Sequence, residues 1–500
     1  MRSTLFSFNT RHFLVVVCTL YLTICCNGEP VSVAAGDSSS DDGGGGAPME
    51  SGEKAALFSA IQGFVGNLWN GSDLYPDPCG WSPIQGVSCD IFNGLWYVTE
   101  LSIGPVHDNS LGCGPKVEFR PQLFQLKHLK SLSFFNCFIK HPVSIPPNNW
   151  GNLGSTLQVL EFRSNPGLTG QVPTSLASLV NLQSLVLIEN GLTGGLPANI
   201  GNLANLKRLV LAGNRFSGRI PENYGLLSKM LILDLSRNQL SGPLPSTFGG
   251  LTSLLKLDLS NNQLQGNLPS VIGNLKNLTL LDLRNNKFSG GLTKSLEGLT
   301  SLEEMALSSN PLGGDLMGLQ WHKLQNLVVL DLSNVGLAGL VPNSVAELKR
   351  LRFLGLSDNN LTGKLLPELA TLPCLSALYL NGNNLTGDIQ FPDVFMGKLR
   401  RRFGAWGNPN LCYPLEMVSP SNAPYGVKPC QLGEEDDEQV KLLKLNANSK
   451  WEKRGNTNVG QKDSGGLIMA SWGSPSLAIC GVWWVLLVEI VVVVLCSGSC

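Results

Sequence analysis

Residues 254–262 read Leu-Leu-Lys-Leu-Asp-Leu-Ser-Asn-Asn, and this stretch decides the fold. Leu254, Leu257, Leu259 and Asn262 give it the pattern L-x-x-L-x-L-x-x-N. The alternation in L-x-L predicts a short strand with one apolar face, which a single strand cannot bury alone. The asparagine follows where the chain turns out of the strand. Its amide can both donate to and accept from backbone groups that would otherwise be buried without partners.

The same pattern recurs along the chain at a nearly constant spacing. From Asn165 to Asn383 the asparagine position advances by 24 or 25 residues at each step. The copies begin at Leu157, Leu182, Leu206, Met230, Leu254, Leu278, Leu302, Leu327, Leu351 and Leu375. Stacked copies of this length predict an α/β-type solenoid, with a parallel sheet on its concave face and a continuous leucine core behind it. We place about 11–12 repeats in residues 98–399, with an insert at 104–128.

Two copies depart from the pattern at the asparagine position. Cys137 replaces the asparagine in the first full repeat, and Val335 replaces it in the copy that begins at Leu327. A cysteine can partly replace the hydrogen bonds of the amide, whereas valine has no polar side-chain group. We therefore expect a local irregularity at Val335.

A second pattern follows each asparagine, as in residues 240–245, Leu-Ser-Gly-Pro-Leu-Pro. The glycine permits a turn with positive φ, and the final proline ends a short edge segment without needing a hydrogen-bond donor. Four later copies lack this proline and have Thr293, Met317, Leu366 and Gln390 in its place. The pattern L-[TS]-G-x-[IL]-P resembles the plant extracellular leucine-rich repeat over about residues 55–430. The resemblance implies a leucine-rich repeat superhelix in a secreted protein.

The amino-terminal residues favour the secretory pathway. Residues 1–28 combine a basic flank, an apolar stretch and small residues near a cleavage point, which is typical of a signal peptide. An uncut signal anchor is the alternative. Residues 29–54 are rich in Gly, Ser and Asp, and we expect a low-complexity linker there.

The carboxyl-terminal residues predict attachment to a membrane. Residues 477–495 are apolar except for Glu489, and residues 431–476 would form a stalk before them. Three small residues from Ser464 and a ten-residue spacer precede this tail, in the order that a glycosylphosphatidylinositol signal requires. Ser464 is then the candidate lipid attachment site. A single-pass transmembrane helix is one alternative, although no Lys or Arg follows Lys462 to hold a cytoplasmic end, and a soluble product is the other.

Seven cysteines remain between these two ends. Cys79 and Cys89 lie in residues 77–89, which resemble the C-x-W-x-G-V-x-C cap of plant leucine-rich repeat ectodomains, so the resemblance implies an amino-terminal cap at 55–97. Cys412 and Cys430 take the place of the closing cap at 400–430, and a capped solenoid end needs such closure because it exposes core leucines. Cys113 and Cys137 are expected to pair across the insert. We interpret the remaining cysteine, Cys374, as a small buried thiol.

Residues 77–137 are more specific than the repeats. Their sequence, together with the insert and Cys113, resembles the Piriformospora indica-insensitive protein 2 group of plant leucine-rich repeat receptor-like proteins. The resemblance implies a cell-surface protein needed for the response to a beneficial root-colonising fungus. It also implies that this protein signals without an intracellular kinase. The 70 residues after Cys430 are too few for a kinase domain.

The residue between the second and third leucine of each repeat lies on the exposed face of its predicted strand. The candidate concave face around this ladder comprises Arg163, Arg208, Asp234, Asp258, Asp282, Arg284, Asp331, Phe353 and Tyr379. Arginine and aromatic side chains are common interface hot spots, so we predict a surface that binds a peptide or protein. The alternative is an ordinary solvated face, because L-D-L-S is usual in such repeats.

Other features narrow the function. N-glycosylation sequons begin at Asn70, Asn277, Asn360 and Asn384, and the occupancy of Asn277 is left open because it directly precedes a strand. No pattern for catalysis, metal ligation or cofactor binding is found, and the five histidines are scattered. With 36 basic and 37 acidic residues, the net charge of −1 gives no reason to expect a nucleic acid partner.

The favoured hypothesis is therefore a non-enzymatic receptor-like protein at the outer face of the cell membrane. It would bind a protein or peptide ligand through the solenoid and depend on a membrane receptor kinase as its partner. The alternative is a wall-associated inhibitor of microbial polysaccharide hydrolases, a class that shares the repeats and caps but normally lacks a hydrophobic tail.

Overall fold

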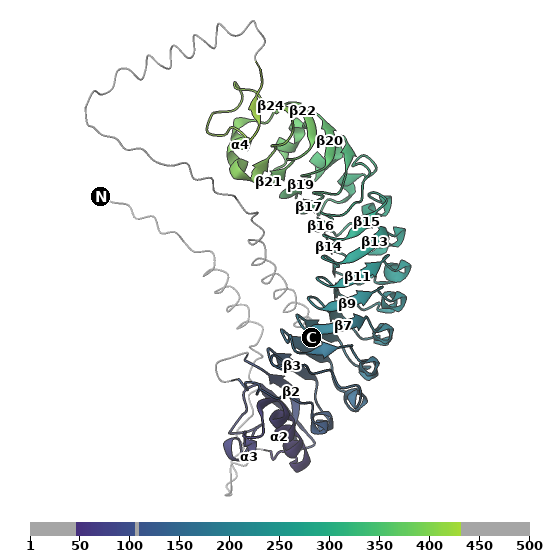
Figure 1. Ribbon diagram of the computed structural model, residues 1–500, viewed down its shortest axis with the longest axis vertical. Coiled ribbons are helices and arrows are strands. Elements are labelled where there is room, and N and C mark those ends of the chain that lie inside the picture. Colours follow the sequence, from purple (N-terminus) through teal and green to yellow (C-terminus); the bar gives the residue numbers. More distant parts are fainter. Residues whose placement is uncertain (1–46, 106–109, 432–500) are drawn as a thin grey trace, which may run out of the picture. The chain divides into compact units, whose positions relative to one another are not determined.

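The structure is a computed structural model that describes residues 47–105 and 110–431. The predicted signal peptide, residues 29–46 of the linker, residues 432–476 of the stalk and the apolar tail lie outside these residues. Figure 1 shows parallel strands side by side along the inner side of a curved stack of repeats. No helix within the described ranges is long and apolar enough to cross a membrane.

The inner side of the stack is one 14-stranded sheet. Its strands, in spatial order, are β1 (Val87–Phe92), β2 (Leu95–Ile103), β3 (Ser131–Phe135), β4 (Val159–Arg163), β6 (Ser184–Ile188), β8 (Arg208–Val210), β10 (Ile232–Asp234), β12 (Lys256–Asp258), β14 (Leu280–Asp282), β16 (Glu304–Ala306), β17 (Val329–Asp331), β19 (Phe353–Gly355), β21 (Ala377–Tyr379) and β23 (Phe403–Gly404). Only β1 and β2 pair antiparallel; every later pair is parallel. The predicted parallel sheet is confirmed.

Short strands form a second layer on the outer side (Figure 1). One sheet contains β5 (Thr169–Gly170), β7 (Gly191–Gly195), β9 (Arg215–Gly218), β11 (Gln239–Gly242), β13 (Gln263–Asn267) and β15 (Lys287–Ser289), and another contains β18 (Ala338–Gly339), β20 (Asn360–Gly363), β22 (Asn384–Asp388), β24 (Asn410–Tyr413) and β25 (Lys428–Pro429). These strands coincide with the second sequence pattern. Its glycines, such as Gly242 and Gly266, have φ near +80°, as the turn requires.

Each repeat returns to the sheet through a short helix. The 3-10 helices are η1 (Pro121–Gln125), η2 (Trp150–Leu153), η3 (Thr174–Ser178), η4 (Ala198–Asn202), η5 (Glu222–Leu226), η6 (Ser246–Gly250), η7 (Ser270–Asn274), η8 (Lys294–Gly298), η9 (Trp321–Lys323), η10 (Asn343–Glu347), η11 (Pro367–Thr371) and η12 (Arg400–Arg402). In the part of the chain that the structure describes, the α-helices are α2 (Ser51–Val65), α3 (Gly71–Leu74) and α4 (Asp393–Leu399). The repeat leucines fill the core between sheet and helices, and Leu254, Leu257 and Leu259 are all completely buried.

The recurrent asparagine links each repeat to its neighbour. The Asn262 Nδ2 atom donates to the Leu235 carbonyl and to the Leu259 carbonyl, both at 3.0 Å. The Leu240 amide donates to Asn262 Oδ1, also at 3.0 Å. The residue just before the asparagine has positive φ in most repeats, with side chains as different as Ser164, Glu189, Arg237, Asn261 and Asp358. The sequence analysis missed this position because no residue type marks it.

The expected irregularity occurs at Val335. In a regular repeat, an asparagine there would accept a hydrogen bond from the Leu312 amide, as Asn310 does from the Phe288 amide at 3.1 Å. The Leu312 amide instead donates to the Asn310 carbonyl at 2.8 Å. The outer layer is interrupted at the same place, since β15 and β18 belong to different sheets.

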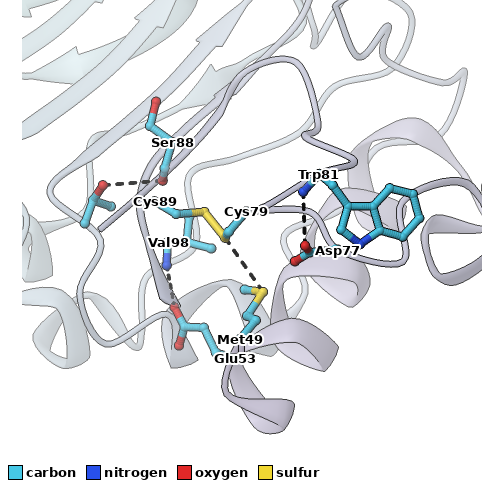
Figure 2. Close-up of a disulfide and its surroundings, with 9 residues drawn as sticks. Met49, Glu53, Asp77, Cys79, Trp81, Ser88, Cys89 and Val98 are labelled. Atoms are coloured by element: carbon cyan, nitrogen blue, oxygen red, sulfur yellow. Dashed lines mark hydrogen bonds between the residues drawn. A yellow bond between two sulfur atoms is a disulfide. The ribbon is translucent and has the colours of Figure 1, made fainter. Parts of the chain in front are cut away.

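The amino-terminal cap begins earlier than its predicted boundary, because α2 starts at Ser51 inside the segment assigned to the linker. Figure 2 shows the disulfide of this cap and the buried Glu53 beside it. Glu53 accepts a hydrogen bond from the Val98 amide at 3.2 Å, and burial raises the pKa of its carboxyl to about 7. The carboxyl thus ties the first turn of α2 to β2.

Among the described residues, six cysteines pair as three disulfides, Cys79–Cys89, Cys113–Cys137 and Cys412–Cys430. The interpretation of Cys374 as a buried thiol is wrong, because its side chain is exposed. The position before the first leucine of a repeat lies at the outer edge of the core. Asn181 and Asn205 occupy equivalent positions, and their exposed amides each donate to a carbonyl of the preceding repeat.

Candidate binding face

The parallel register places the side chains of the concave face in columns. Lys256 pairs with Leu280, and Asp258 pairs with Asp282. Since side chains alternate along a strand, residues on either side of the buried Leu257 point away from the core. We name three columns by their place in the repeat: the first precedes the second leucine, the second lies between the second and third leucines, and the third follows the third leucine.

The second column brings together three of the predicted aspartates. Asp234, Asp258 and Asp282 are successive partners on β10, β12 and β14. Asp331 is separated from them by Ala306. Asp234 is only 9% exposed and Asp282 only 1%, so these two carboxylates do not form an ordinary solvated face.

Hydrogen-bond donors of the same chain pair with the carboxylates of this acidic stripe, which comprises Asp234, Asp258 and Asp282. The Arg284 guanidinium covers Asp282, with Nε 3.0 Å from Oδ1 and Nη2 2.6 Å from Oδ2. The Ser236 and Ser260 amides donate to Asp234 and Asp258, each at 2.9 Å. Burial raises the pKa of both these carboxyls, and the neighbouring aspartates raise that of Asp258 further.

The predicted arginines at the amino-terminal end are also paired. Glu161 accepts from Arg163 Nε at 2.8 Å and from Arg208 Nη1 at 3.4 Å. Burial lowers the pKa of Arg208, although the Glu161 charge opposes this shift. Between these groups and the aspartates lies a separate apolar cluster of Val186, Val210, Ala212 and Ile232, which the sequence analysis did not single out.

The predicted aromatic residues meet at the carboxyl-terminal end of the sheet. The rings of Phe353 and Tyr379 lie 5.7 Å apart between centroids and are tilted by 46°. Trp406, which the sequence analysis missed, lies in the next repeat, and its ring is 6.1 Å from that of Tyr425. Residues 400–408 follow the repeat pattern in a degenerate form, with Arg400, Phe403, Ala405 and Asn408 at the pattern positions, and this alignment would have placed Trp406 in the third column.

The four sequon asparagines, Asn70, Asn277, Asn360 and Asn384, are exposed. Burial therefore does not exclude glycosylation of Asn277, although its Nδ2 atom donates a hydrogen bond to the Thr252 carbonyl at 2.9 Å. Asn360 and Asn384 begin β20 and β22 of the outer layer, outside the columns. The predicted attachment site Ser464 lies outside the described residues, and within them no group of three or more potential metal ligands occurs.

These features define a class: a capped solenoid of plant-type leucine-rich repeats with a side-chain-rich concave sheet. The family described as "Leucine-rich repeat region" matches residues 198–315, and the shorter "Leucine Rich Repeat" matches residues 181–203 and 350–372.

Among curated proteins, the chain is 64% identical over 418 residues to "Piriformospora indica-insensitive protein 2" of Arabidopsis thaliana, covering 82% of this chain and 97% of that protein. The chain belongs to this family of plant extracellular leucine-rich repeat receptor-like proteins. It is also 35% identical over 153 residues to "Receptor like protein 29" of Arabidopsis thaliana, covering 29% of this chain and 31% of that protein.

Solved plant receptor ectodomains share the fold. The PEPR1–AtPEP1 structure matches with a TM-score of 0.57 and 29% identity, covering 76% of this chain and 55% of that one. The Arabidopsis receptor kinase HAESA, in complex with the peptide hormone IDA and the co-receptor SERK1, matches with a TM-score of 0.56 and 30% identity, covering 73% and 62%. The chain therefore spans a little over half of these two solved chains.

Proposed function

We propose that this chain is a receptor-like protein at the plant cell surface that binds a protein or peptide ligand and has no kinase of its own. The carrying observation is the carboxyl-terminal end of the concave sheet, where the aromatic rings of Phe353 and Tyr379 lie together on the face opposite the leucine core. Two similar solved ectodomains are complexes with AtPEP1 and with the peptide hormone IDA. These likenesses support binding of a peptide, with a membrane receptor kinase as signalling partner.

The proposal extends to a response to a root-colonising beneficial fungus, which the name of the 64% identical relative supports. It also includes attachment to the outer face of the membrane through the apolar tail, with Ser464 as the lipid site. Release of the protein from membranes by a phosphatidylinositol-specific phospholipase is the expected result. Retention on the membrane would contradict lipid attachment and favour the transmembrane alternative.

The test of function is affinity capture with the full-length protein, carrying a tag in residues 29–46, from root membrane and fungal wall extracts. Mass spectrometry should identify a receptor kinase that is enriched over a control chain. The Tyr379→Ala variant should capture less of it, and Trp81→Ala, an exposed aromatic in the amino-terminal cap, should capture the same amount. Enrichment of a polysaccharide hydrolase with reduced activity would replace the receptor proposal by the inhibitor alternative.

A further inference from the structure

The last three strands of the concave sheet form a small lattice of side chains. Their register aligns Phe353 with Ala377 and Gly355 with Tyr379, and then Tyr379 with Gly404. The first column therefore holds Phe353, Ala377 and Arg402; the second holds Gly355, Tyr379 and Gly404; the third holds Ser357, Asn381 and Trp406. The three aromatic residues Phe353, Tyr379 and Trp406 occupy the diagonal, one in each repeat and one in each column.

Two glycines allow the aromatic rings to lie over the strands. A Cβ atom at Gly404 would lie 2.9 Å from ring atoms of both Tyr379 and Trp406. A Cβ atom at Gly355 would lie 2.9 Å from the Phe353 ring. Both glycines have ordinary negative φ, so their role is the missing side chain rather than the backbone conformation.

The aromatic side chains at the Trp406 end of the diagonal are exposed to solvent. Trp406 is 39% exposed, and Tyr425, whose ring meets it edge to face, is 82% exposed. Large exposed aromatic side chains that cluster in this way mark interaction sites, because they leave apolar area in water. The centroid distances are 5.7 Å for Phe353–Tyr379 and 6.1 Å for Trp406–Tyr425.

The polar atoms around the rings are mainly hydrogen-bond donors. Trp406 Nε1 and the Arg402 guanidinium can only donate, and neither they nor the Tyr379 hydroxyl has a partner among the described residues. Asn381 Oδ1 already accepts from the Ser357 hydroxyl at 2.9 Å, which leaves its NH₂ group to donate.

Each oxygen of the nearest carboxylate already accepts one hydrogen bond. Asp331 lies beside Gly355, where a Cβ atom would be 2.8 Å from its Oδ1 atom. Its Oδ1 accepts from the Ser333 amide at 3.2 Å and its Oδ2 accepts from the Ser308 hydroxyl at 2.8 Å. The unpartnered donors of Trp406 and Arg402 therefore favour a ligand that is rich in hydrogen-bond acceptors.

We propose that this aromatic diagonal binds a proline-rich segment in the polyproline II conformation, with an acidic residue of that segment at Arg402. Prolines present carbonyl acceptors and no amide donors, so they complement the donors of the site. Polyproline II is an extended helix with three residues per turn and no internal hydrogen bonds, so its proline rings and carbonyl groups are free to contact an aromatic surface. Aromatic-lined grooves recognise such segments, which lose little entropy on binding.

This inference rests on the proposed ligand-binding function and is tested separately from it. The full-length protein, purified in detergent from plant cells, is titrated into a fluorescein-labelled peptide of eight prolines with one central glutamate. A Gly/Ser peptide of the same length with the same glutamate is the reference, and trigalacturonate is added as a competitor. Fluorescence anisotropy should report binding of the proline peptide at least about tenfold tighter than of the Gly/Ser peptide, without displacement by trigalacturonate.

Three variants test whether the proline peptide binds at the aromatic diagonal. Tyr379→Ala and Gly404→Ala should each weaken it about tenfold or more, the first by removing the central ring and the second by displacing two rings. Arg402→Gln should reduce the preference for the glutamate peptide over an all-proline peptide. Trp81→Ala is the matched control, a 76% exposed aromatic in the amino-terminal cap, and should bind as the unaltered protein does. Circular dichroism melts check that each variant is folded. If Tyr379→Ala is not folded, Trp406→Phe provides a milder change on the same diagonal.

The outcomes separate the inference from the proposed function. Equal binding of both peptides, binding unaffected by the diagonal variants, or binding of trigalacturonate in place of the proline peptide would overturn the inference. If a receptor kinase is captured in a Tyr379-dependent manner while the proline peptide does not bind, the proposed function stands and the ligand chemistry named here is wrong.

Discussion

At the centre of the concave sheet the second column holds Asp258 and Asp282, whereas at its carboxyl-terminal end the same column holds Tyr379 between two glycines. The central carboxylates are covered by Arg284 and by amides two residues further along the chain. At the carboxyl-terminal end, the Tyr379 hydroxyl has no hydrogen-bond partner among the described residues.

The difference shows that one repeat pattern produces two kinds of surface. A charged group whose partner belongs to the same chain contributes to the fold, and a ligand would have to displace that partner to use it. A hydrogen-bond donor beside an exposed ring that has no partner within the chain gains a partner other than water only when a ligand binds. We therefore assign a structural role to the centre of the sheet and ligand binding to its carboxyl-terminal end.

Removing the cation at the centre should have the largest effect. Arg284→Met leaves Asp282 buried without its guanidinium partner, which should cost about 3 kcal/mol of unfolding free energy at pH 7. Arg402→Met, which removes an arginine with no ion-pair partner among the described residues, should cost less than about 0.5 kcal/mol. Urea unfolding of both variants measures the difference, and equal losses would remove the distinction between the two regions.

The acidic stripe should also give the centre a characteristic pH dependence. The pKa of Asp258 is raised above its usual 3.8 by burial and by Asp234 and Asp282. Folding therefore favours the protonated carboxyl: the stabilisation is complete below pH 3.8 and is lost as pH rises through the raised pKa. Asp258→Asn should raise Tm by about 2 °C at pH 7 and lose this advantage towards pH 4, as measured by calorimetry. A constant Tm difference across that range would contradict the raised pKa.

The smallest effect expected concerns a single donor at the carboxyl-terminal end. Trp406→Phe keeps an aromatic ring on the diagonal but removes the Nε1 donor. Affinity for the proline peptide should fall about threefold, since one neutral hydrogen bond contributes about 1 kcal/mol or less. Anisotropy titration measures this change, with an unchanged melting temperature as control. A loss as large as that of Tyr379→Ala would mean that the donor, rather than the stacking, dominates.

The repeated residues made the fold predictable. Asn262 and Leu257 recur at a fixed spacing, and each needs the neighbouring repeat to satisfy its amide or bury its side chain. Val335 could be recognised as irregular for the same reason, because it lacks the group that its position uses. The aspartate column was also predictable, since L-D-L fixes which side of the strand the carboxylate occupies.

The state of each side chain was not predictable in the same way. The burial of Asp282 depends on the conformation of Arg284, and the exposure of Cys374 depends on where the core ends rather than on residue type. The aromatic diagonal arises only when three strands are in register, and its third member, Trp406, lies in a repeat whose sequence is degenerate. A single-repeat pattern contains no information about such neighbours.

The most direct test of this account is hydrogen–deuterium exchange on the full-length protein with and without the partner obtained by affinity capture. On binding, exchange should become slower in residues 353–355, 377–381 and 402–406 and should change little in residues 232–236 and 256–260. Protection confined to the central strands, with unchanged exchange at the carboxyl-terminal end, would contradict it.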